Sequence, residues 1–276
     1  MSIKKENIQN IYPLTSVQQG MLFHGLADEH TVAYFQQTTW HLRGAIQPEL
    51  FQQAWNLLVN HHDILRTVYS YELSDTPLQI VLKNRLLDLN LIDFTAHEAE
   101  EARALSQQTK IADQNTPFDL KSGPLMRLTL IKMDNQLWQF MLSHHHILLD
   151  GWSYGLLLKA FIDIYQTLYL NKTPSLVPEF PFSQFIKWLS TQPLVTAKAY
   201  WNDRLIGFTE KNEWAFHQTK LLPQNHKPFV TSDIANIESV SELNQQLTQV
   251  QTEQLKKLAL NNGVTINAIL QTIVGI

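Results

Sequence analysis

The stretch MLSHHHILLDGWS, residues 141 to 153, is the most informative part of this chain, because three consecutive histidines end an apolar run. Hydrophobic cores seldom contain histidine, so the cluster calls for an explanation. The apolar run predicts a strand that is central and buried in its sheet. Asp150 and Gly151 come next, a pair typical of a tight turn, and an apolar helical pattern begins at Trp152.

Three interpretations of this cluster are open from the local sequence. Strand alternation places His144 and His146 on one face and His145 on the other, if the strand continues that far. In the simplest interpretation the histidines are ordinary polar residues, and Ser153 helps to cap the next helix. In the second, His144, His146 and Asp150 bind zinc. In the third, a histidine exchanges protons at neutral pH, and Asp150 orients a neighbour or pairs with a cation.

Composition limits the class of protein. The 276 residues are 44% hydrophobic and 17% charged, with a formal net charge of -4, which fits a globular protein. No basic stretch interleaves with aromatic residues, so we expect no nucleic-acid partner. The absence of cysteine excludes disulfides and a cysteine nucleophile, and it fits a cytoplasmic location. No apolar run reaches the roughly 18–20 residues that span a bilayer, so we expect no membrane partner.

Helical and strand patterns alternate along the chain, which predicts an α/β (α+β) fold. Thr15 and Gln18 form a capping pattern at the start of the first helix. Strands are predicted at residues 34–42, 64–73, 78–83, 126–133, 137–146 and 231–240, and further helices at 47–63, 96–113, 152–169, 182–189, 195–205, 252–261 and 265–276.

The loop at residues 171–181 contains three prolines and is the best candidate for a domain boundary. It separates residues 1–175 from residues 176–276. The helical pattern that starts at Thr265 continues to the last residue without a capping signal, so we expect the chain to be a fragment.

One family matches several of these stretches. HHILLDG, residues 145–151, resembles the His-His-x-x-x-Asp-Gly motif of condensation domains in nonribosomal peptide synthetases, whose shorter form occurs in chloramphenicol acetyltransferase. Other stretches resemble further motifs of that family in the same order: YPLTSVQQGMLFH (12–24), NHHDILRTVY (60–69), PFDLKSGPLMR (117–127), FSQFIKWL (182–189) and AYWNDRL (199–205). Phe182 and Gln184 depart from the Tyr and Asp usual in the fourth of these.

The resemblance implies a chloramphenicol acetyltransferase-like mixed sheet flanked by helices, as the first half and the start of the second half of a two-lobed fold. It implies that His146 is the central catalytic residue, with His145 as its flanking motif residue. It also implies that Asp150 pairs with Arg66 instead of acting as a base, and that Gly151 lines the substrate tunnel. Trp152 and Ser153 would support the site, whereas His144 has no role in the family.

The activity implied is amide formation between a donor acyl or peptidyl thioester and the amine of an acceptor aminoacyl thioester. Both substrates would be carried on the phosphopantetheine of donor and acceptor carrier proteins, beside an adenylation domain, with no cofactor or metal bound directly. Alternatives are an epimerisation domain, a free CoA-dependent acyltransferase, and an inactive half-domain that serves for docking. Cyclisation domains carry Asp at the key position, so His146 argues against that class.

Overall fold

The computed structural model describes residues 4–27, 34–71, 76–176, 180–209 and 246–274. Contacts divide the chain into two compact units, residues 1–212 and 213–276, which we describe separately. This division lies beyond the proline-rich loop where the sequence suggested a boundary. The helix after that loop, α5 (Phe182–Ser190), belongs to the first unit because it packs against β1 (Ile8–Pro13).

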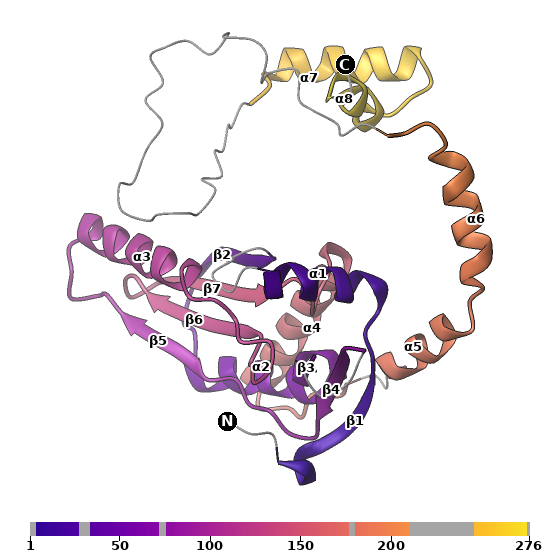
Figure 1. The fold of residues 1–276 in the computed structure, drawn as a ribbon. Coiled ribbons are helices and arrows are strands. Elements are labelled where there is room, and N and C mark those ends of the chain that lie inside the picture. Colours follow the sequence, from indigo (N-terminus) through magenta and orange to yellow (C-terminus); the bar gives the residue numbers. More distant parts are fainter. Residues whose placement is uncertain (1–3, 28–33, 72–75, 177–179, 210–245, 275–276) are drawn as a thin grey trace. The chain divides into compact units, whose positions relative to one another are not determined.

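The larger sheet contains four strands in the order β2-β7-β6-β5 (Figure 1). β7 lies between β2 and β6 and runs antiparallel to both, while β5 is parallel to β6. The strand that leads to the histidines is therefore central and buried, as its apolar sequence predicted. The strands are Phe35–Arg43 (β2), Leu89–Asp93 (β5), Met126–Lys132 (β6) and Leu137–His145 (β7).

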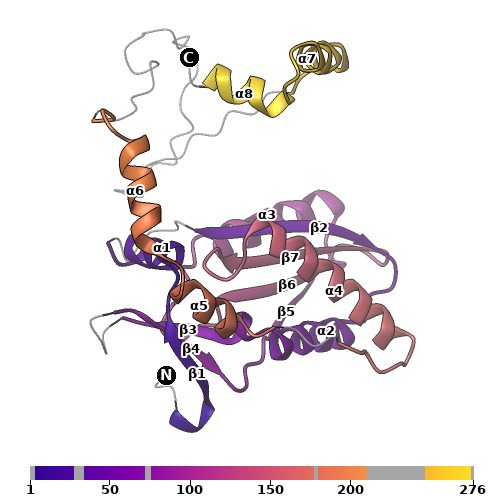
Figure 2. The same cartoon turned by 90° about the vertical axis from the view of Figure 1, so that its right-hand side faces the viewer.

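Helices cover both faces of this sheet (Figure 2). α2 (Pro48–His61) and α4 (Gly151–Tyr169) pack on one face, and α3 (Ala99–Gln114) lies on the other. Alternate residues of β7 face α2 and α4, where Phe140 meets Phe51 with ring centroids 4.8 Å apart. Burying such large aromatic rings provides much of the driving force for packing, at about 25 cal/mol per Å² of apolar surface.

The smaller sheet contains β1, β4 (Leu78–Leu82) and β3 (Thr67–Ser70), all antiparallel, in the order β1-β4-β3. The strand predicted at residues 78–83 is confirmed as β4, and it pairs with β3, the strand before it in the chain. The strand expected over residues 64–73 is shorter than predicted, because Asp63–Arg66 forms a 3-10 turn, η2. β1 was not predicted from the sequence.

The remaining helices were largely anticipated. Thr15 and Gln18 form the predicted capping box, with side chains and backbone N–H groups bonded reciprocally at 3.0 and 3.1 Å. No helix among the described residues is long and apolar enough to cross a bilayer. The strand predicted at residues 231–240 lies outside the described residues. The helices are α1 (Ser16–Ala27), α6 (Leu194–Arg204), α7 (Gln249–Asn261) and α8 (Ile266–Val274), with a short 3-10 turn, η1, at Lys5–Asn7.

Candidate active site

The histidine motif lies where the central strand ends and α4 begins. β7 finishes at His145, so strand alternation does not extend to His146. Both neighbouring strands hold the backbone at this point: the His145 N–H donates to Leu125 O at 3.0 Å, and the His146 N–H donates to Tyr34 O at 2.8 Å. The three side chains consequently enter three different environments.

His146 is half-buried and its ring is fixed by its own turn. Its Nδ1 lies 2.7 Å from the backbone oxygen of Leu149. A carbonyl oxygen can only accept, so Nδ1 must carry the proton and Nε2 of the neutral ring is left as a hydrogen-bond acceptor. This is the tautomer that a proton-accepting histidine requires.

His144 and His145 are buried. The His144 ring stacks on Tyr154 at 5.3 Å, and Nδ1 of His145 accepts a hydrogen bond from the backbone N–H of Ile147 at 3.1 Å. Burial, together with the nearby His146 and His145, lowers the pKa of His144 to about 4. Burial and the nearby His146 likewise lower the pKa of His145 to about 4. Both rings are therefore neutral parts of the packing around His146 at physiological pH.

These lowered pKa values predict that the protein loses stability in mild acid. The unfolded chain protonates these histidines near pH 6.5, whereas the folded chain protonates them only near pH 4. The unfolded state thus binds more protons between these values. As the pH is lowered, the free energy of unfolding therefore decreases by up to about 1.4 kcal/mol per pH unit for each histidine. Urea unfolding between pH 7 and pH 4 measures this slope.

The variant His144→Phe is the matched control for that measurement, because it keeps a ring against Tyr154 but cannot be protonated. Its slope should be about half that of the wild type, since one of the two titrating groups is gone. A wild-type stability that does not change between pH 6.5 and pH 4 would contradict the prediction.

Asp150 is exposed and caps α4. Its Oδ1 accepts a hydrogen bond from the backbone N–H of Ser153 at 2.7 Å. This hydrogen bond lowers the pKa of the Asp150 carboxyl, with a smaller contribution from His146. The expected capping role of Ser153 is thus reversed: its N–H is the donor, and Asp150 is the residue that caps.

The pairing of Asp150 with Arg66 that the family resemblance implied is wrong in this structure. Arg66 Nη2 lies 2.7 Å from Oδ1 of Asp63, three residues earlier in η2. The buried guanidinium also donates to Val59 O, Leu82 O and Gln9 Oε1. Lys83 O also accepts, at 3.3 Å. A local carboxylate and these four acceptors satisfy the charge, so Arg66 supports the junction between α2 and the smaller sheet.

Gly151 and Trp152 begin α4 and are exposed, and Trp152 is 88% exposed. A Cβ atom at Gly151 would meet no described atom within 4 Å, and its φ is not in the left-handed region. In this structure, then, Gly151 is not required by its backbone conformation or by close packing.

Gly151→Ala is therefore expected to keep the free energy of unfolding or raise it by up to about 1 kcal/mol, since alanine favours a helix. Gly44→Ala is the matched control: that site is equally open, but its φ of +113° disfavours any residue with a Cβ. Thermal unfolding of both variants checks this, and a clear loss of stability in Gly151→Ala would refute it.

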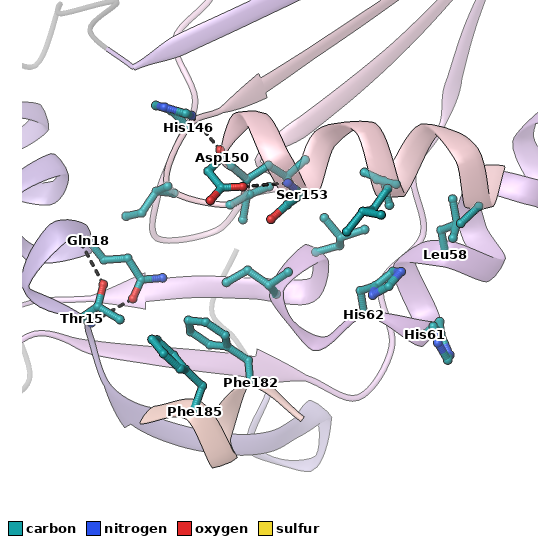
Figure 3. A pocket seen from close by; sticks show the side chains of 18 of the residues that line it. Thr15, Gln18, Leu58, His61, His62, His146, Asp150, Ser153, Phe182 and Phe185 are labelled. Carbon is teal, nitrogen blue, oxygen red and sulfur yellow. Dashed lines mark hydrogen bonds between the residues drawn. The ribbon is translucent and has the colours of Figure 1, made fainter. Parts of the chain in front are cut away.

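A cavity of about 970 Å³ lies beside His146 (Figure 3). Its walls come from α1, the end of α2, the turn at residues 146–150, α4 and α5. The wall is mainly apolar, and its polar lining consists of Thr15, Ser16, Gln18, His61, His62, His146, Asp150, Ser153, Asp163 and Ser175.

Sequence reasoning did not name most of these lining residues as functional. Most of the polar lining residues nevertheless fall in the stretches that carried the family resemblance, at residues 12–24, 60–69, 145–151 and 182–189, whereas Ser153, Asp163 and Ser175 lie outside them. Motifs that lie far apart in the chain thus converge on one cavity, with the half-buried His146 at its edge.

The described residues include no cluster of three His, Cys, Asp or Glu side chains that could hold a metal ion. His144 is buried against Tyr154, whereas Asp150 is exposed and engaged as a helix cap. The ligands of the zinc interpretation are therefore not brought together.

Known proteins resemble this chain along almost its whole length. The chain is 35% identical over 269 residues to bacitracin synthase 3 of Bacillus licheniformis, and 35% identical over 272 residues to tyrocidine synthase 2 of Brevibacillus parabrevis. These matches cover 98% and 99% of the chain but only 4% and 7% of the relatives.

Solved structures share the fold. A mutant of the starter condensation domain of rhizomide synthetase aligns with a TM-score of 0.68 at 21% identity, over 76% of this chain and 51% of that one. The first condensation domain of the calcium-dependent antibiotic synthetase aligns with a TM-score of 0.63 at 18% identity, over 73% of this chain and 49% of that one. The condensation domain profile matches residues 8–276, and the chain belongs to the condensation domain family.

Proposed function

We propose that this chain takes part in amide bond formation between a donor acyl or peptidyl thioester and the amine of an acceptor aminoacyl thioester. The observation that carries the proposal is the hydrogen bond from His146 Nδ1 to Leu149 O, which leaves Nε2 as an acceptor beside the cavity. Membership of the condensation domain family supports the same assignment.

In the proposed reaction, the acceptor amine nitrogen attacks the thioester carbonyl carbon and donates a hydrogen bond to Nε2 of His146. The tetrahedral intermediate collapses with cleavage of the carbon–sulfur bond, and the proton lost by the amine passes to the departing thiolate. Free α-amines have pKa values near 8 and imidazoles near 6.5, so an imidazole is a feasible but weak base. Orientation of the amine therefore contributes much of the rate.

Asp150 serves this site through its backbone contact. Its carboxylate ends the turn that starts at His146 and fixes the first turn of α4, which is the stabilisation expected of a helix N-cap. The buried His145 ring accepts the Ile147 N–H at Nδ1, and this hydrogen bond fixes the start of the same turn. In this proposal only His146 contacts the reacting atoms.

We propose donor and acceptor carrier proteins, an adenylation domain and a cytoplasmic location as the setting of this reaction. The curated relatives cited above are much longer than this chain, which leaves room in them for such partners. The substrates would arrive on phosphopantetheine arms, and the chain itself would bind no cofactor.

A product assay tests the proposal. Donor and acceptor carriers are loaded with aminoacyl groups and mixed with the 276-residue chain, or with a longer protein that contains it, and dipeptidyl product is measured by mass spectrometry. Deuterium uptake at the donor Cα without product would indicate an epimerisation domain instead. Product formed from free acyl-CoA alone would indicate a CoA-dependent acyltransferase, and absence of all three would indicate an inactive docking piece.

A further inference from the structure

A second polar cluster lies on the α3 face of the larger sheet. Asp113, near the end of α3, accepts hydrogen bonds from three side chains on three different strands. Arg127 Nε donates to Oδ1 at 2.7 Å, while Gln37 Nε2 at 2.7 Å and Ser143 Oγ both donate to Oδ2. The carboxylate is largely buried, with 12% of its side chain exposed.

The three donors form one row across the sheet. Ser143 on β7 is directly opposite Gln37 on β2 and opposite Arg127 on β6. Residues in register on adjacent antiparallel strands project to the same face, so one carboxylate reaches all three. Asp113 therefore bonds to three of the four strands of the larger sheet, at the level of β7 just before the histidines.

Arg127 extends this cluster beyond the sheet. Its Nη2 donates to the backbone oxygens of Asp113 at 2.9 Å and Thr116 at 2.7 Å. The guanidinium lies 4.0 Å from the centroid of the Phe118 ring and 5.6 Å from that of Phe35. These contacts give a structural role to Arg127, the last residue of the stretch at 117–127.

The same strands hold the start of the turn at residues 146–150, two or three residues further along. Leu125, just before β6, accepts from the His145 N–H, and Tyr34, just before β2, accepts from the His146 N–H. A slip of β7 by one residue would move its end by about 3.3 Å and turn Ser143 away from Asp113. The Asp113 row thus opposes the displacement that would break the bond to Tyr34.

We propose that Asp113 and Arg127 are positioning residues for His146, and that they act by fixing the register of β7 between β2 and β6. The proposal rests on the proposed function, because it assigns these residues to the same reaction. They touch no substrate: the cluster lies on the α3 face, and none of its residues lines the cavity.

The first test is Asp113→Asn, which keeps the size of the side chain but leaves the Arg127 charge without its carboxylate and turns an amide towards the donors. Turnover should fall about 100-fold with KM unchanged, as expected when a catalytic group is displaced by about 1 Å. Arg127→Lys retains the charge but loses the planar fork of N–H donors. Its turnover should lie between that of the wild type and that of Asp113→Asn.

The second test keeps the proposal falsifiable if Asp113→Asn does not fold. Ser143→Ala removes one donor of the row, while Ser106→Ala removes an equivalent bond between α3 and β7, to Gln139, at the far end of the strand from His146. Ser143→Ala should lower turnover, and Ser106→Ala should not, at matched thermal stability.

Imidazole ¹⁵N spectra of the 276-residue chain provide a readout that does not need activity. The wild type should show His146 protonated at Nδ1, and Ser143→Ala should shift the ring towards a mixture of tautomers, whereas Ser106→Ala should not. Equal spectra and equal turnover in the two serine variants would overturn the positioning role. If the wild type shows His146 protonated at Nδ1 but forms no amide product, that result would instead count against the proposed function and not against the positioning role.

Discussion

Replacing His146 with alanine is expected to lower the turnover of amide formation by about 100- to 10,000-fold, the range typical of losing a positioned acid–base group. The loss follows from the ring's geometry: Nε2 is the free acceptor because Nδ1 is committed to Leu149 O. Stability should change little, since His146 is only half-buried and stands outside the tightly packed core.

Two further replacements separate the roles of the two ring nitrogens. In His146→Asn the side-chain amide can donate to Leu149 O in place of Nδ1, so the turn should remain but turnover should be as low as in His146→Ala. His146→Gln places an amide near the position of Nε2. Turnover close to that of the wild type in His146→Gln would show that orienting the amine by a hydrogen bond is enough for catalysis. Turnover as low as in His146→Ala would show that the reaction needs proton transfer to the ring.

The control for this series is His97→Ala. His97 is a surface histidine that contacts Glu101 at 3.1 Å, with 37% of its side chain exposed, so its loss should leave turnover unchanged. Product formation by His146→Ala at the wild-type rate would rule out His146 as the central residue.

Much of the frame that presents His146 could be predicted from the sequence. The apolar run before the histidines gave a central strand, the Asp150-Gly151 turn gave the start of a helix, and periodic apolar residues gave α2 and α4. These signals are local and strong, because a buried strand and an amphipathic helix each impose their own spacing of apolar residues.

The smaller sheet was harder to predict. β1 shows little alternation of apolar and polar residues, and it ends at Pro13. It forms a strand because it pairs with β4, which lies far away in the sequence. Such tertiary pairing overrides weak local propensity. η2 was also missed, since the β-branched and aromatic residues after it gave the impression of one continuous strand.

The side-chain chemistry of the site was the least predictable part. Strand alternation placed His144 and His146 together, but β7 stops at His145, and His144 instead stacks on Tyr154. The ring tautomer of His146 depends on a carbonyl three residues away, which the pattern of residues cannot reveal.

The largest loss of stability is expected from Asp63→Ala. Only 5% of the Arg66 side chain and 14% of the Asp63 side chain are exposed, and their contact is 2.7 Å long. Removing the carboxylate leaves a buried guanidinium without a counter-ion, which typically costs about 3–5 kcal/mol. Asp150→Ala, by contrast, removes only an exposed helix cap and should cost about 1 kcal/mol.

Combining each change with Arg66→Met identifies the true partner of the arginine. Asp63→Ala with Arg66→Met removes both charges and should recover most of the stability lost in Asp63→Ala, because an apolar side chain can fill the site. Asp150→Ala with Arg66→Met should instead show the sum of the two separate losses. Urea unfolding at pH 7 measures all five variants, and strong coupling of Arg66 to Asp150 rather than to Asp63 would restore the pairing that the family resemblance implied.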